Sequence, residues 1–259
     1  MHIHPTKIRF LGTGTSTGVP QIGCNCSVCQ SSDRHDKRYR SSILVSFPSD
    51  NNILIDCGPD FYHQILRENS PHLSALLLTH IHYDHIGGME DLRYYCSKGA
   101  FPVYCDSGVA KDLHNRLPYC FSSVPYPGSP SYDIHLIHAF KPFKVNDVEI
   151  TPLPIKHYQL DILGFYFRNF AYITDCKEMP EKTMACIRNI DTLIINALRR
   201  TSHMSHLSLQ EALDIIDKLK PRRAFLTHIS HQMGKHAEIQ SILPPNVQLA
   251  YDGLEIEIP

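Results

Sequence analysis

The strongest constraint on this chain is the segment THIHYDH at residues 79–85, which follows directly on the apolar run SALLL. It places His80, His82, Asp84 and His85 within six positions. A buried strand that turns into a helix here can direct the first two side chains towards one cation and the last two towards a second. Neutral imidazoles and carboxylates suit zinc, manganese or iron. We therefore expect a metal site rather than an incidental cluster of surface histidines.

Four short apolar runs, the one before His80 included, end in a side chain that can bind metal, and each is interpreted as a buried strand. These runs are NILIDCG with Asp56, SALLLTH with His80, AYITD with Asp175 and RAFLTH with His228. The simplest geometry gathers such strand ends along one edge of packed sheets, where ligand sites commonly lie. We expect the chemistry at that edge.

A helix is expected after the loop LRRTSHMSH, because Ser208 and Glu211 have the spacing of a capping box. Pro221 should end it. The apolar face of this helix would consist of Leu209, Ala212, Leu213, Ile216 and Leu219. Residues 117–132 contain four prolines and are expected to form an extended surface loop that could flank a substrate cleft.

Composition favours one soluble globular domain spanning residues 1–259, since 42% of residues are hydrophobic and no apolar run is long enough to cross a bilayer. The start MHIHPTKIRF lacks the features of a secretory signal. Nine cysteines, an odd number, suit a reducing compartment, so a cytoplasmic location is expected. A net charge of -1 gives no general attraction to nucleic acid, and no membrane partner is expected.

The segment HIHYDH after a buried strand resembles the signature of the metallo-β-lactamase superfamily. His157 in LPIKH, Asp175 in YITD and His228 in LTH follow in the family's order, and the match extends from FLGTGTSTG to LTHISHQ. The resemblance implies an α/β fold, the four-layer αββα sandwich. GTGTSTGVP, GCNCSVC, TPLPIKH, MPEKT and LTHISHQ together look like the PhnP-type phosphodiesterases, which open cyclic phosphate esters.

This resemblance implies a catalytic site with two divalent cations, zinc or manganese. It assigns His80, His82 and His157 to one cation, Asp84, His85 and His228 to the other, and Asp175 to a bridge between them. Asp56 is either a partner that orients a histidine N–H or a turn former, and we favour the first. Cys176, next to the bridging aspartate, is expected in the core.

Cys24, Cys26 and Cys29 lie within six positions with no fourth cysteine beside them. His231, three residues after His228, can complete a Cys3His set, and PhnP-type relatives show this arrangement. Such a closed tetrahedral site is structural, because no position remains for water or substrate. We expect one zinc ion that fastens the N-terminal loop to the wall of the active site. Three reduced thiols with an exposed histidine remain the alternative.

A dinuclear site implies that a metal-bridging hydroxide attacks phosphorus, with Asp84 as a catalytic carboxylate beside it. The leaving oxygen then needs a proton. His206 matches the residue to which PhnP-type and tRNase Z relatives assign this role, and an ordinary histidine pKa suits it. His203 is close enough in sequence to compete for the same role.

The expected substrate is a small phosphate ester, and PhnP-like relatives suggest a homodimer. A tRNase Z-like endoribonuclease is the first alternative, but such enzymes carry a long arm between the positions of His157 and Asp175, where this chain has only 17 residues. The remaining alternatives are another hydrolase of the same fold and a metal-dependent binding module without turnover.

The glycine-rich LGTGTSTGVP lacks the lysine of a nucleotide P-loop. We expect it to form a tight turn, with glycines at positive φ, whose amides border the substrate. The basic run RHDKRYR at 34–40 and the pair Arg199 and Arg200 are typical of solvated faces, although one arginine near the active edge could hold a phosphate.

Overall fold

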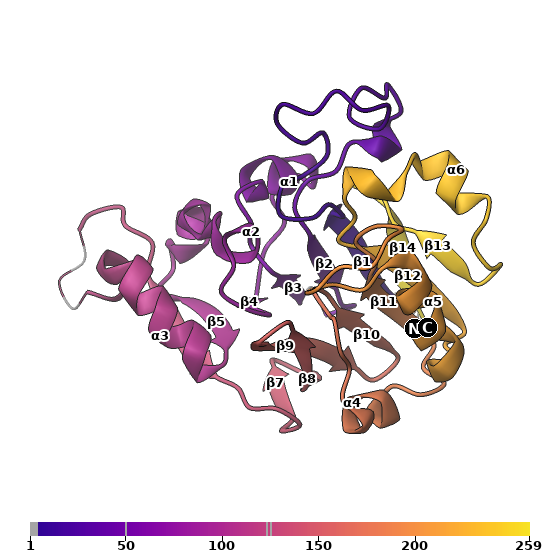
Figure 1. Ribbon diagram of the computed structural model, residues 1–259. Coiled ribbons are helices and arrows are strands. Elements are labelled where there is room, and N and C mark those ends of the chain that lie inside the picture. The colour runs from indigo at the N-terminus through magenta and orange to yellow at the C-terminus, as the bar shows by residue number, and fades with distance from the viewer. Residues whose placement is uncertain (1–4, 50, 123, 125) are drawn as a thin grey trace.

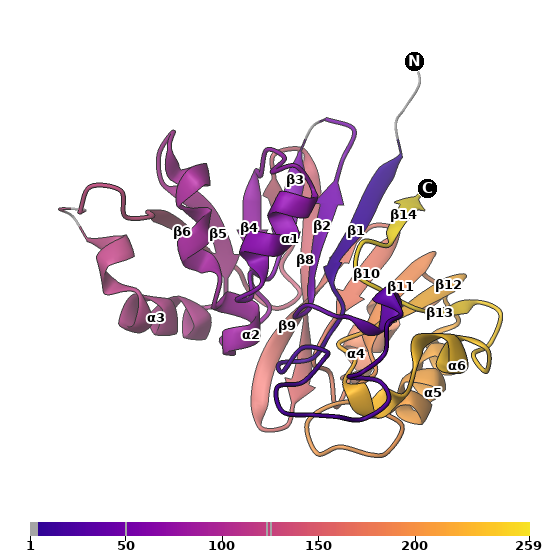
Figure 2. The same cartoon turned by 90° about the horizontal axis from the view of Figure 1, so that it is seen from above.

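The computed structural model describes residues 5–49, 51–122, 124 and 126–259. Two seven-stranded sheets lie face to face, and helices cover the outer face of each (Figures 1 and 2). The α/β fold is therefore the four-layer αββα sandwich, as the resemblance implied. Among the described residues, no helix has both the length and the apolar character needed to pass through a bilayer.

The first sheet has the strand order β14-β1-β2-β3-β4-β5-β6, and β3 to β6 run parallel. Its strands are β1 (Thr6–Gly12), β2 (Ser42–Ser46), β3 (Asn52–Ile55), β4 (Ala75–Leu77), β5 (Phe101–Cys105), β6 (Tyr132–Leu136) and β14 (Glu255–Ile258). The helices on its side are α1 (Phe61–Arg67), α2 (Tyr83–Ile86), η2 (Met89–Cys96), α3 (Ser107–Arg116) and η3 (Pro118–Phe121).

The second sheet has the order β13-β12-β11-β10-β9-β8-β7, with β10 to β13 parallel. Its strands are β7 (Phe143–Val145), β8 (Val148–His157), β9 (Leu160–Phe167), β10 (Phe170–Ile173), β11 (Thr192–Asn196), β12 (Arg223–Thr227) and β13 (Val247–Leu249). The helices on its side are α4 (Glu181–Cys186), α5 (Leu209–Leu219), η4 (His231–Met233) and α6 (His236–Gln240), and η1 (Arg34–Asp36) lies in the N-terminal loop.

Apolar side chains fill three layers, one between the sheets and one under each set of helices. Because successive strand residues point to opposite faces, Ile53 and Ile55 of β3 enter the middle layer while Leu54 packs under the helices. Strands of both sheets contribute to that middle layer, for example Phe10 and Phe165. The two sheets therefore share one core.

Helix α5 forms as the sequence predicted. Ser208 caps it, and the carboxylate of Glu211 accepts a hydrogen bond from the Ser208 amide at 2.7 Å, which completes the capping box. The helix ends at Leu219, where Lys220 adopts a left-handed conformation just before Pro221. The expected loop at 117–132 instead contains the short helix η3, and its positions 123 and 125 lie outside the described residues.

The N-terminal glycine-rich segment differs in part from expectation. Gly18 has a positive φ of 65°, but Gly12 and Gly14 are needed for close approach, since a Cβ at either position would collide with the backbone of residues 38–40. In the basic run at 34–40, Arg34 is exposed as expected, but Arg38 is not. Arg38 is buried and donates to the hydroxyl of Thr13 and to the carbonyl of Ala250, so the chain uses its charge internally.

Candidate metal centre and catalytic site

The predicted ligands lie where strands of both sheets end. Asp56 follows β3, His80 follows β4, Asp175 follows β10 and His228 follows β12, while His157 is the last residue of β8. The backbones of Asp56, Asp175 and His228 are left-handed, with φ of 62°, 53° and 56°. Such conformations are uncommon outside glycine and gather at functional sites. The fold therefore brings these side chains to one edge, as expected.

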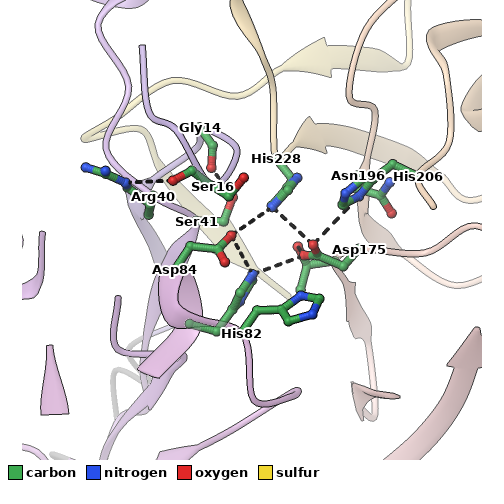
Figure 3. Close-up of polar contacts among 12 residues, drawn as sticks. Gly14, Ser16, Arg40, Ser41, His82, Asp84, Asp175, Asn196, His206 and His228 are labelled. Carbon is green, nitrogen blue, oxygen red and sulfur yellow. Dashed lines mark hydrogen bonds and ion pairs between the residues drawn. The ribbon is translucent and has the colours of Figure 1, made fainter. Parts of the chain in front are cut away.

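Donor atoms cluster into neighbouring groups in which every pair of atoms lies within 4.8 Å. The groups are His80, His82 and His157; Asp84, His85, Asp175 and His228; and His157, Asp175 and His206. Asp175 belongs to two of them, as a bridging carboxylate requires. Figure 3 shows Asp84, Asp175 and His228 facing one another, with His206 on the Asp175 side.

The surroundings of His85 test whether a cation fits. Its Nδ1 lies 2.7 Å from Oδ2 of Asp56, which accepts the N–H. Its Nε2 lies 3.1 Å from Asp84 and 3.3 Å from Asp175, and it makes a hydrogen bond to neither. Burial alone lowers the pKa of His85, but the surrounding carboxylates raise it well above the usual value. The surrounding carboxylates favour positive charge at this point, which a divalent cation would supply.

Two more imidazoles are oriented in the same way. Nδ1 of His157 lies 2.8 Å from the carbonyl oxygen of Ser205, and a carbonyl can only accept, so Nδ1 carries the proton. Nδ1 of His80 contacts the hydroxyl of Thr79 at 2.9 Å, and this hydroxyl also bonds to Asp56. The Nε2 lone pairs of both rings are thus left for the centre, as at metal sites whose ligands are fixed by outer partners.

The protonation of Asp175 and His80 agrees with this arrangement. Burial raises the pKa of Asp175, but His228 and His85 outweigh it and hold that pKa well below its usual range. Burial lowers the pKa of His80, so its ring is neutral. Ionised carboxylates and neutral imidazoles are the forms that bind metals.

His206 also lies at this site. Its side chain is 11% exposed, and its Nδ1 is 3.7 Å from Oδ1 of Asp175. Burial lowers the pKa of His206 to about 3, below the ordinary value on which the sequence expectation relied. His203 lies behind it, with ring centroids 5.3 Å apart, and its Nδ1 contacts Ser205. The geometry therefore favours His206 over His203 as the residue that faces the reaction.

The cysteine segment meets the expected histidine. Nδ1 of His231 lies 3.4 Å from Sγ of Cys24 and 3.3 Å from Sγ of Cys26, and Cys29 completes the cluster. The hydrogen bond from His231 lowers the pKa of Cys26 to about 6, whereas burial raises that of Cys29 to about 11. Three sulfurs and one imidazole nitrogen form the donor set of a structural zinc site.

Basic and small residues border the Asp84 side of the centre (Figure 3). Arg40 donates to the carboxylate of Asp60 at 3.0 Å and to the carbonyl of Ser16 at 3.1 Å, so its charge is already paired. The Ser41 hydroxyl donates to the carbonyl of Gly14. The glycine-rich segment thus borders the site, as expected, while Arg40 is held by its own neighbours.

Sequence reasoning missed the threonines that precede three of the ligands. Thr79 precedes His80 and binds Asp56 through its amide and hydroxyl, and the hydroxyl of Thr174 donates to Asp175 at 2.6 Å. Thr227 precedes His228. The repeated pattern of threonine before ligand was the available signal. By contrast, no sequence pattern indicated the role of the Ser205 carbonyl.

Comparison with known proteins gives a consistent result. Residues 51–229 match the family described as "Beta-lactamase superfamily domain". A solved structure titled as a new diphosphatase from the PhnP family is 35% identical, with a TM-score of 0.91 over 98% of this chain and 97% of the other. The chain belongs to the metallo-β-lactamase superfamily, and within it to the PhnP family. It is a hydrolase of that fold.

Two further proteins extend the comparison. An octanoyltransferase from Porphyromonas gingivalis is 43% identical over 95% of this chain, but this chain spans only 50% of that protein's length. Zinc-bound PqqB from Methylobacterium extorquens is 20% identical, with a TM-score of 0.81 over 97% of this chain and 99% of PqqB. The likeness to PqqB shows the shared fold alone.

Proposed function

We propose that this protein of the metallo-β-lactamase superfamily is a dinuclear metal-dependent phosphodiesterase that opens a small, cyclic phosphate ester. One observation carries the proposal. The two donor groups lie side by side, and Asp175 belongs to the group around His85 and also to a group with His157. The PhnP-family relative, described as a diphosphatase, supports hydrolysis at a phosphoryl group, although a diphosphatase cleaves an anhydride rather than an ester.

The proposed residues divide between two divalent cations, zinc or manganese. His80, His82 and His157 would hold one, Asp84, His85 and His228 the other, and Asp175 would contact both. When bound, such a pair lowers the pKa of water and stabilises negative charge on phosphoryl oxygens. Asp84 is the carboxylate proposed to orient the attacking water. Its Oδ2 also lies 3.4 Å from Nε2 of His228.

His206 is proposed to deliver the proton that the leaving oxygen needs. Its imidazole is neutral at pH 7 in the free protein, because burial lowers its pKa to about 3. A bound phosphate anion raises the pKa of a neighbouring imidazole, so substrate binding favours the protonated ring. The proposed role therefore requires that His206 take up a proton on substrate binding and give it to the departing alkoxide.

Substitution His206→Ala tests the function and this role together. With a nucleoside 2′,3′-cyclic phosphate, whose leaving alkoxide is strongly basic, we expect kcat to fall by roughly 100-fold or more. With bis(p-nitrophenyl) phosphate, whose leaving phenolate needs no proton, we expect little change. Metal content should equal that of the wild type. Full turnover of the cyclic ester by this variant would remove His206 from the reaction.

Two other activities remain to be distinguished. Between His157 and Asp175 the chain forms only the strands β9 and β10, which leaves no place for the arm of a tRNase Z-like enzyme. Hydrolysis of a diphosphate is favoured only by the description of the PhnP-family relative. A panel of cyclic phosphodiesters, nucleoside diphosphates and precursor tRNA, each with metal-loaded protein, would decide among the three.

Several expectations from the sequence stay predictions. They are the structural zinc at Cys24, Cys26, Cys29 and His231, the cytoplasmic location, the homodimer and the absence of a nucleic-acid partner.

A further inference from the structure

The loop between β11 and α5 carries His206 and contains neither helix nor strand. Its base is closed by backbone hydrogen bonds, one from the amide of Leu198 to the carbonyl of Leu207 at 2.8 Å. Residues 200–206 therefore depend on side chains for their shape. A loop of this kind opens easily unless such contacts hold it.

Arg199 supplies contacts of this kind. Its Nε donates to the carbonyl of Thr201 at 3.2 Å and its Nη2 to the carbonyl of Ser202 at 2.8 Å. Its Nη1 donates to Oε1 of Gln232 at 3.0 Å. Because the guanidinium fork is planar and rigid, three bonds from one group fix the start of the loop against the segment after β12. The arginine is therefore occupied within the protein rather than free for a substrate.

Near its other end the loop is held by His157, one of the proposed metal ligands. The carbonyl of Ser205 accepts the hydrogen bond from Nδ1 of His157, one residue before His206. Gln232, on the Arg199 side, directly follows His231 of the cysteine cluster. His206 thus lies between two restraints, one from a ligand of the catalytic pair and one from Arg199.

We propose that Arg199 is a positioning residue for His206, which holds residues 200–206 in the shape that keeps the imidazole beside Asp175. The inference rests on the proposed function, because it assigns His206 the role of proton donor to the leaving oxygen. The contact with Gln232 links Arg199 to the segment that carries His231. A displacement of about 1 Å in such a group costs about 100-fold in rate.

The test compares Arg199→Ala with Arg200→Ala, the neighbouring exposed arginine, whose side chain has no hydrogen bond or ion pair among the described residues. With a nucleoside 2′,3′-cyclic phosphate, Arg199→Ala should lower kcat by roughly 10- to 100-fold with a smaller change in KM. With bis(p-nitrophenyl) phosphate the change should stay under about threefold. Arg199→Lys should behave like the alanine variant, since an ammonium cannot make the three-way contact.

Two further measurements separate positioning from general damage. Amide hydrogen exchange in residues 200–206 should become faster in Arg199→Ala and not in Arg200→Ala, with metal content unchanged in both. The double variant Arg199→Ala with His206→Ala should be no slower on the cyclic ester than His206→Ala alone, because both changes remove the same step.

Other outcomes overturn the inference. Equal losses on both esters would mean that Arg199 is merely structural, and additive losses in the double variant would mean that it does not act through His206. Unchanged exchange in Arg199→Ala would show that it does not hold the loop. If wild-type protein cleaves neither ester, the proposed function fails, while the exchange experiment still tests whether Arg199 holds the loop.

Discussion

Asp56 shows how one residue controls the centre without being a ligand. Its carboxylate accepts a hydrogen bond from the amide of Thr79 at 2.9 Å and another from the N–H of His85 at 2.7 Å. The Asp56 side chain is completely buried. The sequence left open whether this aspartate orients a histidine or only forms a turn. The structure shows that it does the first, with a left-handed backbone that positions it to do so.

Substitution Asp56→Asn should weaken the catalytic metal pair. Asparagine tolerates the left-handed backbone, so the fold should persist, but it loses the charge that orients and polarises His85. We expect affinity for the catalytic cations to fall by about 10- to 100-fold, measured by metal titration. Asp217→Asn, on the exposed face of α5, is the matched control, and unchanged affinity in Asp56→Asn would contradict the role.

Helix α5 is the element that fixes the far end of the His206 loop. Its N-terminal capping box holds Ser208 and Glu211 together, and Lys177, two residues beyond Asp175, donates to Glu211 at 2.7 Å. Burial raises the pKa of Glu211, but the bonds from Lys177 and Ser208 outweigh it and lower that pKa to about 2. The ionised carboxylate is therefore the form that stabilises the helix start.

The stability contributed by Glu211 should depend on pH. Since its pKa is lowered on folding, the unfolded chain binds the extra proton, so the contribution is present above about pH 4.5 and is lost as pH falls towards 2. The difference in unfolding free energy between wild type and Glu211→Gln should shrink between pH 6 and pH 3. Denaturant titrations at several pH values would measure it.

Glu238→Gln on α6 is the control, because the Glu238 carboxylate makes no hydrogen bond or ion pair within the described part of the chain. The difference in unfolding free energy between Glu238→Gln and wild type should not vary with pH in the same way. A constant difference for Glu211→Gln would show that the capping carboxylate is not responsible.

At the scale of the whole molecule, the N-terminal loop is joined to the second sheet. Gly14 forms a bridge with Ile229, and Arg38 reaches the carbonyl of Ala250 at 2.6 Å. The cluster of cysteines with His231 joins the same loop to η4, which precedes α6 in the chain. A zinc ion bound there only in the folded state would stabilise the contact between the loop and the wall of the site.

Substitution His231→Ala tests this zinc. The variant should contain one zinc ion fewer per chain than the wild type, because three thiolates alone do not complete a tetrahedral site. Its Tm should also fall, since the binding free energy of the ion contributes to folding. Elemental analysis and thermal unfolding would measure both. His72→Ala, an exposed histidine whose ring makes no hydrogen bond, ion pair or aromatic pairing in the described ranges, is the control, and an unchanged zinc count in His231→Ala would contradict the assignment.

From the sequence alone, apolar strands that end in Asp or His indicated candidate ligands at one sheet edge, because these are local patterns whose chemistry is readable, and the resemblance to the metallo-β-lactamase superfamily implied the fold and the full ligand set. Only the tertiary structure decided what orients them. The contact of His85 with Asp56, of His157 with the carbonyl of Ser205, and of Arg199 with Gln232 each joins residues far apart in the chain. Such contacts depend on how the two sheets and their loops pack, and no local pattern encodes that packing.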